Sequence, residues 1–240
     1  MNAQKPVLVV GSIALDSLET PKGNRSNVLG GSASYFTLAA SLFTEVRVVG
    51  VVGSDFPEEG FSLYKRTNVN SDNLQVEKGP TFHWGGRYSN DYSERETLFT
   101  ELGVFKSFAP DIIVCHRHTP FLFLGNIHPG LQLHVLDQME KDVMVVTDTM
   151  NLWIDTALSE LKEVLSRTHI FLLNDEEAIQ LTGESDLKQA GKSLLESGPQ
   201  TVIIKQGARG SLLFDKGDCI SVPVYPDVDV KDPTGAGDSF

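Results

Sequence analysis

The residues at the end of the chain combine small, permissive positions with a carboxylate, which suits chemistry on a phosphate group. Gly235, Ala236 and Gly237 have no bulky side chains, so their backbone amides can converge on a phosphate oxygen. Asp238 follows directly, and a carboxylate beside such amides would repel the anion unless it has a task there. We expect it to take the proton of a neutral hydroxyl as that hydroxyl attacks the phosphorus. The four residues alone fit equally well a loop that ends in a helix-capping aspartate.

Motifs along the whole chain, from Val7 to Phe240, resemble in type and order those of the ribokinase (PfkB) family of carbohydrate kinases. The ending DPTGAGD, which starts at Asp232, resembles the carboxy-terminal signature of that family, and Gly30-Gly31 resembles its amino-terminal signature. The other matches are Gly11-Ser12 with Asp16, the run Val49–Gly60, the DxN-like Asp148–Asn151, Asn174–Glu177 and Gly207–Gly210. The resemblance implies a ribokinase-like, three-layer αβα fold with a mainly parallel central sheet and a small β-lid.

The resemblance also implies an activity and a set of residue roles. It implies phosphorylation of a hydroxymethyl group on a sugar or nucleoside by ATP and Mg²⁺, with Asp238 as general base and Gly235–Gly237 as anion hole. The residues assigned to the acceptor are Asp16, Gly30, Gly31 and Tyr35, and those assigned to the nucleotide are Asn174, Glu177, Lys205, Gly207 and Gly210. No direct metal ligand is expected, because Mg²⁺ keeps several waters through which Asn174 and Glu177 would act.

Several of these residues also have plainer structural explanations. Asp16 can accept hydrogen bonds from two vicinal hydroxyls, or it can cap a turn after the first strand. Gly30-Gly31 lets the backbone approach a sugar closely, although such a pair alone is usually a turn. Asn174 and Glu177 stand one helical turn apart on one face, where they can also cap a helix, and both roles can hold at once. We assign no catalytic role to Asp148.

Two features depart from the family pattern. Tyr35 stands where the family usually carries an asparagine that touches the sugar, which argues against free ribose as the substrate. An aromatic residue there could stack on a base or narrow the pocket, and Phe82, Trp84 and Tyr88 fit either a nucleoside site or a packed lid core. Family members also continue well beyond GAGD, whereas this chain ends at Phe240 after too short a helix nucleus to be stable, so we expect a truncated or incomplete chain.

The elements that must position these residues alternate between strands and helices. Short β-branched segments, apolar on consecutive positions, are typical of strands covered by helices on both faces. The predicted strands are Val7–Ile13, Val46–Gly53, Asp111–His116, Phe121–Ile127, Val143–Thr149, Ile170–Asn174, Thr201–Gln206 and Gly210–Asp215, and the predicted helices are Ser32–Phe43, Asp155–Arg167, Asp175–Thr182 and Asp186–Glu196. This alternation predicts an α/β protein with a mainly parallel sheet, folded as one domain over residues 1–240.

Residues 17–28 and 74–101 interrupt the alternation and are predicted to form the lid. Within the second segment, Phe82–Trp84 and Arg95–Phe99 predict an antiparallel hairpin joined through Ser89–Ser93. Lids exclude water and sequester reactants, although a surface β-excursion without a function fits the same pattern. An exposed lid edge could pair with that of a second copy, which would give a homodimer.

The composition argues against several other classes of protein. The chain has 240 residues with 20 basic and 32 acidic side chains, and its formal net charge of −12 argues against nucleic-acid binding. No apolar segment approaches the roughly 20 residues of a membrane span, and Met1–Pro6 lacks a signal-peptide pattern. Cys115 and Cys219 are too few for a disulfide framework, so we expect a cytoplasmic protein that does not bind membranes. Cys115–His118 contains an HxH pair without a second ligand cluster, which favours a strand end over a metal site.

We therefore expect a carbohydrate kinase whose partner is a small sugar or nucleoside. Two alternatives on the same fold stay open: a non-catalytic sugar- or nucleoside-binding protein, and a kinase of a vitamin precursor such as a hydroxymethylpyrimidine. The early end of the chain favours the binding protein, whereas Asp238 argues against it, because a protein without turnover needs no base beside a phosphate nest. The sequence has no GxxxxGK[ST] motif, and GAGDSF lacks the third glycine of a dinucleotide fingerprint.

Overall fold

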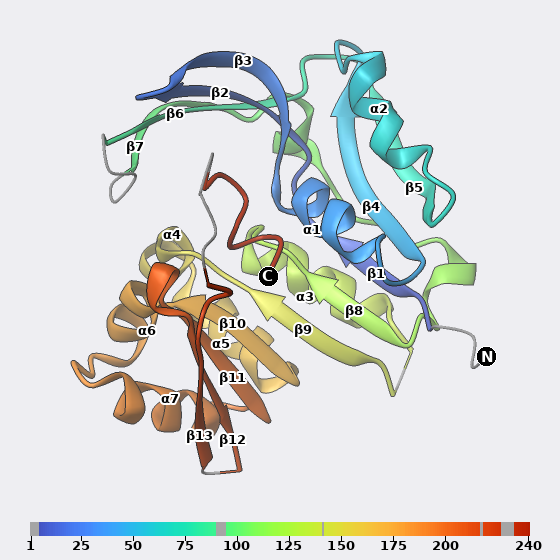
Figure 1. Ribbon diagram of the computed structural model, residues 1–240. Helices are drawn as coiled ribbons and strands as arrows, with labels where there is room; N and C mark the ends of the chain where they lie inside the picture. Colours follow the sequence, from blue (N-terminus) through green and yellow to red (C-terminus); the bar gives the residue numbers. More distant parts are fainter. Residues whose placement is uncertain (1–4, 90–94, 141, 217, 227–232) are drawn as a thin grey trace. The chain divides into compact units, whose positions relative to one another are not determined.

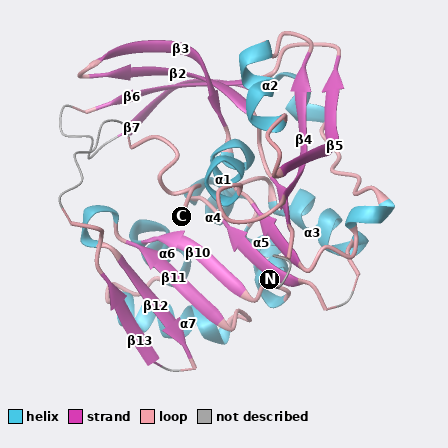
Figure 2. Cartoon of the chain, turned by 45° about the vertical axis from the view of Figure 1, so that its right-hand side comes forward, coloured by secondary structure: helices cyan, strands magenta, loops and turns pink. Residues whose placement is uncertain are grey.

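A computed structural model describes residues 5–89, 95–140, 142–216, 218–226 and 233–240 (Figure 1). The chain divides into two compact units, the first made of Met1–His116 with Asp232–Phe240 and the second of Arg117–Lys231. Each unit combines parallel strands with helices, as Figure 2 shows, so the predicted α/β class is confirmed.

The parallel strands of the first unit are built from the β-branched segments singled out in the sequence. They are β1 (Val7–Val10), β4 (Val46–Gly53) and β5 (Val69–Glu77), with β4 pairing with both of the others. All four residues of β1 are buried, as expected for a strand that is covered on both faces. The helices of this unit are α1 (Ser32–Ala40) and α2 (Glu58–Tyr64), and 3₁₀ turns occupy Gly103–Ser107 and Val114–His116.

A separate four-stranded sheet, here called the lid sheet, also belongs to the first unit (Figure 1). Its order is β3-β2-β6-β7, and its strands are β2 (Ala14–Thr20), β3 (Gly23–Gly30), β6 (Phe82–Tyr88) and β7 (Arg95–Glu101). Strands β6 and β7 are antiparallel, as the predicted hairpin requires, while residues 90–93 of its connection lie outside the described residues. The bounds differ from the expected lid, because Leu74–Glu77 lie in β5 and pair with β4. Strands β3 and β7 are the two edge strands of the lid sheet. The pairing of such an edge with the lid of a second copy stays a prediction.

The strand predicted at Asp111–His116 is wrong. Its second half is the short 3₁₀ turn Val114–His116, and its first half has no strand partner among the described residues. The side chain of Asn73 takes the backbone groups instead: its Nδ2 donates to the carbonyl of Asp111 at 2.8 Å, and its Oδ1 accepts from the amide of Ile113 at 2.8 Å. A single buried side chain thus replaces the ladder that the apolar pattern suggested.

The second unit carries four neighbouring parallel strands followed by two antiparallel ones. In sheet order they are β8 (Phe121–Leu124), β9 (Met144–Asp148), β10 (Ile170–Asn174), β11 (Thr201–Lys205), β12 (Ser211–Asp215) and β13 (Asp218–Val222). The helices are α3 (Pro129–Gln138), α4 (Asn151–Thr156), α5 (Leu158–Ser166), α6 (Asp175–Thr182) and α7 (Leu187–Glu196). The core includes Leu161, Leu165, Phe171, Leu173, Ala190, Leu194, Val202, Ile204 and Phe214.

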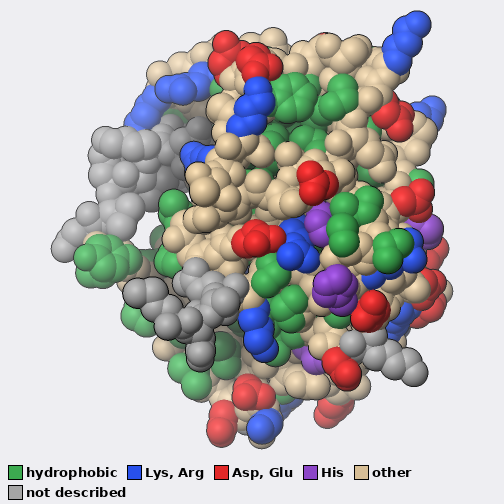
Figure 3. Space-filling model, turned by 90° about the vertical axis from the view of Figure 1, so that its right-hand side faces the viewer, with side chains coloured by type: hydrophobic (Ala, Val, Ile, Leu, Met, Phe, Trp, Pro, Cys, Tyr) green, Lys and Arg blue, Asp and Glu red, His purple; other side chains and the backbone are tan. Residues whose placement is uncertain are grey.

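The face drawn in Figure 3 intersperses acidic, basic and hydrophobic side chains, and its Lys and Arg side chains are scattered over several places. Among the described residues, no helix is both long and apolar enough to cross a membrane.

Candidate active site

Three of the residues predicted to hold the acceptor are brought together in the first unit. Asp16 on β2 is only 5% exposed, and its carboxylate lies directly against Gly30 at the end of β3. A β-carbon on residue 30 would stand 2.1 Å from Oδ2 of Asp16, so any other residue would displace the carboxylate. Gly31 follows with φ +90°, and a β-carbon there would stand 2.4 Å from the carbonyl oxygen of Ser12. The glycine pair is therefore required by two close approaches.

A network of hydroxyl groups holds this glycine pair, and the sequence analysis missed it. The amide of Ser32 donates to Oγ of Ser12 at 3.1 Å, and the amide of Ser12 donates to Oγ of Ser32 at 3.2 Å. Oγ of Ser34 donates to the carbonyl of Gly30 at 2.6 Å and is 2.9 Å from the hydroxyl of Tyr64. Burial raises the pKa of Tyr64 above its usual range, so this hydroxyl stays neutral. The run of small polar residues after Gly31 was the available signal.

The end of the chain, here called the terminal loop (Pro233–Phe240), belongs to the same unit. The helix expected to open at Asp238 is a run of turns, in which the amide of Ser239 donates to the carbonyl of Gly235 at 2.9 Å. Gly235 has φ +74° and lies against the ring of Tyr35, whose own amide donates to the carbonyl of Gly31 at 3.2 Å. Tyr35 therefore links the glycine pair to the terminal loop. Asp232, the first residue of the predicted motif, lies outside the described residues.

The three lid aromatics have different surroundings. Trp84 on β6 is the register partner of Asp16 on β2, so the two side chains project from the same face of the lid sheet. Phe82, the first residue of β6, stacks on Phe105 of the 3₁₀ turn Gly103–Ser107, with ring centroids 5.5 Å apart. The hydroxyl of Tyr88 accepts a hydrogen bond of 3.1 Å from Oγ1 of Thr234 in the terminal loop. Of the three, Trp84 is the one placed beside the predicted acceptor carboxylate.

Asp55, within the run Val49–Gly60, binds the residue that precedes lid strand β6. Its Oδ1 accepts from both the amide and the hydroxyl of Thr81, each at 2.7 Å, just before β6 begins. Both residues also line a cavity of about 340 Å³ together with Leu15 and His83. Because side chains alternate along a strand, this cavity lies on the opposite face of β2 and β6 from Asp16 and Trp84.

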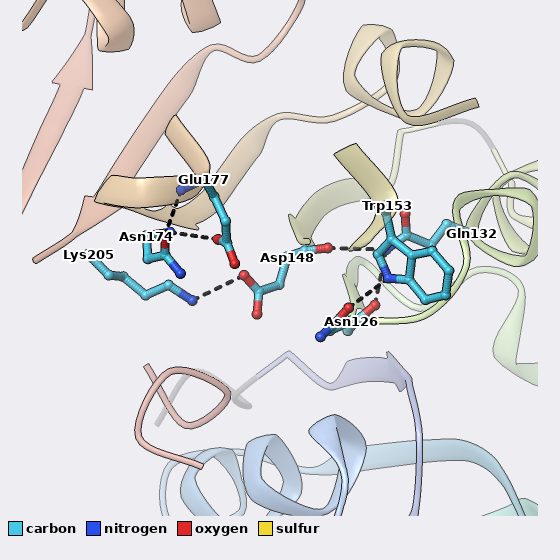
Figure 4. A network of polar contacts seen from close by, with 8 residues as sticks. Asn126, Gln132, Asp148, Trp153, Asn174, Glu177 and Lys205 are labelled. Carbon is cyan, nitrogen blue, oxygen red and sulfur yellow. Dashed lines mark hydrogen bonds and ion pairs between the residues drawn. The ribbon is translucent and has the colours of Figure 1, made fainter. Parts of the chain in front are cut away.

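The predicted nucleotide residues gather in the second unit, at the carboxyl ends of neighbouring parallel strands. Asp148 ends β9, Asn174 ends β10 and Lys205 ends β11. Nζ of Lys205 lies 3.1 Å from Oδ1 of Asp148, and their side chains are only 15% and 6% exposed (Figure 4). This edge is where ligands of open α/β sheets bind. Burial raises the pKa of Asp148, and the Lys205 ammonium opposes that shift.

Asn174 and Glu177 form a complete capping box at the start of α6. Oδ1 of Asn174 accepts from the amide of Glu177 at 2.7 Å, and Oε2 of Glu177 accepts from the amide of Asn174 at 2.8 Å (Figure 4). The capping explanation is thus confirmed. The capping box uses Oε2 of Glu177 and does not involve its other carboxylate oxygen, Oε1. Burial raises the pKa of Glu177 from 4.5 to about 7, and the nearby Asp148 carboxylate acts in the same direction. Oxygen donors of this kind suit Mg²⁺.

The glycine turn after β11 continues the same edge. Gly207 begins the 3₁₀ turn Gly207–Arg209 between β11 and β12, and Gly210 follows that turn; both have positive φ, +55° and +90°. A β-carbon on residue 210 would stand 2.1 Å from the carbonyl oxygen of Val222. Arg209 within the turn pairs with Asp175 at the start of α6. The structure therefore places the predicted nucleotide residues of this unit around one sheet edge and one helix start.

Gln132 on α3 is a further residue of this edge that the sequence analysis missed. Its Nε2 donates to the carbonyl oxygens of Gly125 at 3.0 Å and Asp148 at 3.2 Å, which ties the end of β9 to the residue just after β8 (Figure 4). Nothing in the sequence around Gln132 signals this role. Among the described residues, no group of three or more His, Cys, Asp or Glu side chains is placed to hold a metal ion.

Comparisons with known proteins show what this chain is similar to. A sequence model of the pfkB family carbohydrate kinases matches residues 132–240. The chain is 37% identical over 259 aligned positions to the aminoimidazole riboside kinase of Salmonella typhimurium, covering 100% of this chain and 80% of that one. It is 28% identical over 242 positions to the cytidine kinase of Thermococcus kodakarensis, covering 98% and 85%.

The fold has solved counterparts as well. An E. coli protein provisionally named ribokinase II, solved with ATP and Mg²⁺, superposes with a TM-score of 0.81 at 17% identity, over 98% of this chain and 83% of that one. The predicted ribokinase-like fold is thereby confirmed. Because this chain covers 80% of a relative to which it is 37% identical, it belongs to the pfkB family of carbohydrate kinases, which are phosphotransferases.

Proposed function

We propose that this protein transfers the γ-phosphoryl group of ATP to a hydroxymethyl group of a nucleoside or sugar, with Asp238 as the general base. The observation that carries the proposal is the placement of the Asp16 carboxylate and the terminal loop in one unit, linked through Tyr35. In this proposal that unit would supply an acceptor for hydroxyl groups in Asp16 and backbone donors for a phosphoryl group in Gly235–Gly237.

On the acceptor side, Asp16 would accept hydrogen bonds from vicinal hydroxyls of the ring. Its carboxylate lies directly against Gly30, and burial makes a charged acceptor effective. Trp84 projects from the same face of the lid sheet and offers an aromatic surface. We infer a nucleoside in preference to a free sugar, because the relatives described above are named for cytidine and aminoimidazole riboside.

On the nucleotide side, the sheet edge of the second unit would bind the phosphates. Mg²⁺, when bound, supplies positive charge that shields the phosphate oxygens during transfer. Asn174 and Glu177 would reach the ion through its waters, and Lys205 would place an ammonium group near the phosphates. Gly207 and Gly210 would flank the nucleotide, since a glycine has no side chain that could block the approach of the phosphates.

The acceptor hydroxyl must lose its proton during the transfer, and Asp238 is the proposed base. Asp238 would take the proton from the acceptor hydroxyl as the oxygen attacks the γ-phosphorus and the bond to ADP breaks. The amides of Gly235–Gly237 would stabilise the charge of the transferring group, that of Ala236 only after it leaves the Pro233 carbonyl, to which it donates at 3.1 Å. A loose transition state of this kind needs positioning and charge stabilisation more than covalent chemistry. Asp238 is half-buried and stands three residues after Gly235, which is compatible with a base close to the amides of Gly235–Gly237.

The test is ADP release by the purified protein with ATP and Mg²⁺ against a panel of acceptors. The panel contains cytidine, aminoimidazole riboside, a purine nucleoside, ribose, fructose and a hydroxymethylpyrimidine. Turnover on a nucleoside supports the proposal, and turnover on the pyrimidine alone would favour the vitamin-precursor alternative. Binding of a nucleoside without ADP release, by a protein that is folded, would favour the non-catalytic alternative.

A further inference from the structure

Two tyrosines of the first unit contact adjacent residues of the terminal loop. Oγ1 of Thr234 donates a hydrogen bond of 3.1 Å to the hydroxyl of Tyr88, the last residue of lid strand β6. The ring of Tyr35, in the first turn of α1, lies against Gly235: a β-carbon there would stand 2.3–2.5 Å from Cδ1, Cγ and Cε1. One contact comes from the helix after the glycine pair and the other from the lid sheet.

The terminal loop needs such contacts because its own sequence specifies its conformation weakly. Gly235 and Gly237 have no side chains and Ala236 has only a methyl group, and each glycine loses much conformational freedom when it is ordered. Hydrogen bonds inside the loop include Ala236 amide to Pro233 carbonyl at 3.1 Å and Ser239 amide to Gly235 carbonyl at 2.9 Å. Backbone donors stabilise a developing charge only if they are oriented before the reaction begins.

We propose that Tyr35 and Tyr88 are positioning residues for the terminal loop. The ring of Tyr35 packs against Gly235, and the hydroxyl of Tyr88 holds Thr234 from the lid sheet by a hydrogen bond. The expected effect on turnover rests on the proposed function, in which the amides of Gly235–Gly237 hold the phosphoryl group. Neither tyrosine has to touch the reacting atoms. Trp84 and Tyr88 lie on the same strand, β6. The hydrogen bond of Tyr88 therefore connects the terminal loop to the strand that carries Trp84 beside Asp16.

The first experiment measures kinetics on the full chain with Tyr88→Phe, Thr234→Val and the double variant. Each single change removes the same hydrogen bond, so kcat should fall by about 3–10-fold while the acceptor KM stays within about two-fold. For this hydrogen bond the double variant should be no worse than either single one, because both single changes already remove it. Tyr225→Phe is the control, since Tyr225 is 82% exposed. A raised acceptor KM at constant kcat would assign Tyr88 to the acceptor site and overturn the proposal.

A second experiment follows hydrogen exchange of the amides of residues 234–239 without any ligand. Exchange should be faster in Tyr88→Phe and in Tyr35→Ala than in the wild type, and Tyr35→Phe, which keeps the ring, should restore slow exchange. Unchanged exchange in both Tyr88→Phe and Tyr35→Ala would overturn the proposal. This result does not depend on turnover, so it decides the positioning role even if the protein proves not to be a kinase. If Tyr35→Ala does not fold, Tyr88→Phe alone decides it.

Discussion

Nζ of Lys205 and Oδ1 of Asp148 lie 3.1 Å apart although strand β10 separates the strands that carry them. The lysine reaches over the end of β10, where Asn174 begins the capping box with Glu177. Two buried carboxylates and one ammonium group therefore share the carboxyl edge of three strands. The ammonium group opposes the rise in pKa that burial imposes on both carboxyls. The second unit thus holds an acidic edge that is partly neutralised before any ligand arrives.

Lys205→Met should destabilise the protein by roughly 3 kcal/mol at neutral pH, because it leaves Asp148 buried without its opposite charge. Adding Asp148→Asn to that variant should recover part of the loss, since the amide carries no charge to compensate. Urea unfolding without nucleotide measures both. The control is Arg167→Met, which breaks the pair with Asp137 whose side chains are 36% and 70% exposed and should cost less than about 1 kcal/mol. Equal losses for Lys205→Met and Arg167→Met would contradict a stabilising role of the buried pair.

Glu177 should make stability depend on pH in the absence of Mg²⁺ and nucleotide. Its pKa is raised from 4.5 to about 7 in the folded protein, so between these values the folded state binds a proton that the unfolded state has lost. That proton favours folding below pH 4.5, and its contribution is lost as the pH rises through about 7.

Unfolding free energies at about pH 5 and about pH 8 test this prediction. The wild type should lose more stability over this interval than Glu177→Gln, which keeps the oxygen that accepts from the Asn174 amide but cannot ionise. Glu163→Gln, on the exposed side of α5, is the control and should follow the wild type. Identical pH profiles for the wild type and Glu177→Gln would show that Glu177 does not titrate in this range.

Residue types and local spacing were enough to predict some parts of the site. Asp16, Gly30 and Gly31 come together because a strand, a hairpin and a helix start are local features. The same holds for the capping box, whose two members, Asn174 and Glu177, are three residues apart.

Contacts between distant segments were beyond such reasoning. The Lys205–Asp148 pair depends on the order β9-β10-β11, and the hydrogen bonds of Gln132 depend on how α3 packs. The helix predicted at Asp155–Arg167 is split into α4 and α5, because Ala157 takes φ −141° and ends the first. Its apolar pattern continues through the break, so nothing in the sequence marked it.

Gly30→Ala should weaken acceptor binding. The new β-carbon would stand 2.1 Å from Oδ2 of Asp16, so the carboxylate must move away from its position. We expect the acceptor KM to rise at least about 10-fold, with little change in the KM for ATP, since displaced charged hydrogen bonds are costly. Gly130→Ala, in the first turn of α3, is the matched control. Its β-carbon would come no closer than 3.2 Å to another atom, an imidazole nitrogen of His128, and the acceptor KM should stay unchanged. A normal acceptor KM in Gly30→Ala would remove Asp16 from the acceptor site.

Trp84→Ala should also weaken the acceptor more than ATP. The indole projects beside Asp16 and packs over Gly86, where a β-carbon would meet it at 2.1 Å, so the ring is held along the strand. Loss of an aromatic surface against a base should raise the acceptor KM by roughly 10-fold, and Trp84→Phe should recover most of that loss. Parallel KM measurements for a nucleoside and for ribose sharpen the test. An equal effect on both acceptors would contradict stacking on a base.

Asp238→Asn tests the chemical step itself. The amide has nearly the shape of the carboxylate but cannot accept the proton of the acceptor hydroxyl, so kcat should fall by about 10²–10⁴-fold. The acceptor KM and the unfolding midpoint should stay close to those of the wild type, since the change adds no volume. Asp218→Asn, on the exposed strand β13, controls for the loss of one negative charge and should leave kcat unchanged. Loss of kcat in Asp238→Asn with an unchanged acceptor KM would separate proton transfer from binding. Retained turnover would mean that the proton leaves the hydroxyl by another route, and Asp238 would then be a cap of the turn at Gly235–Ser239.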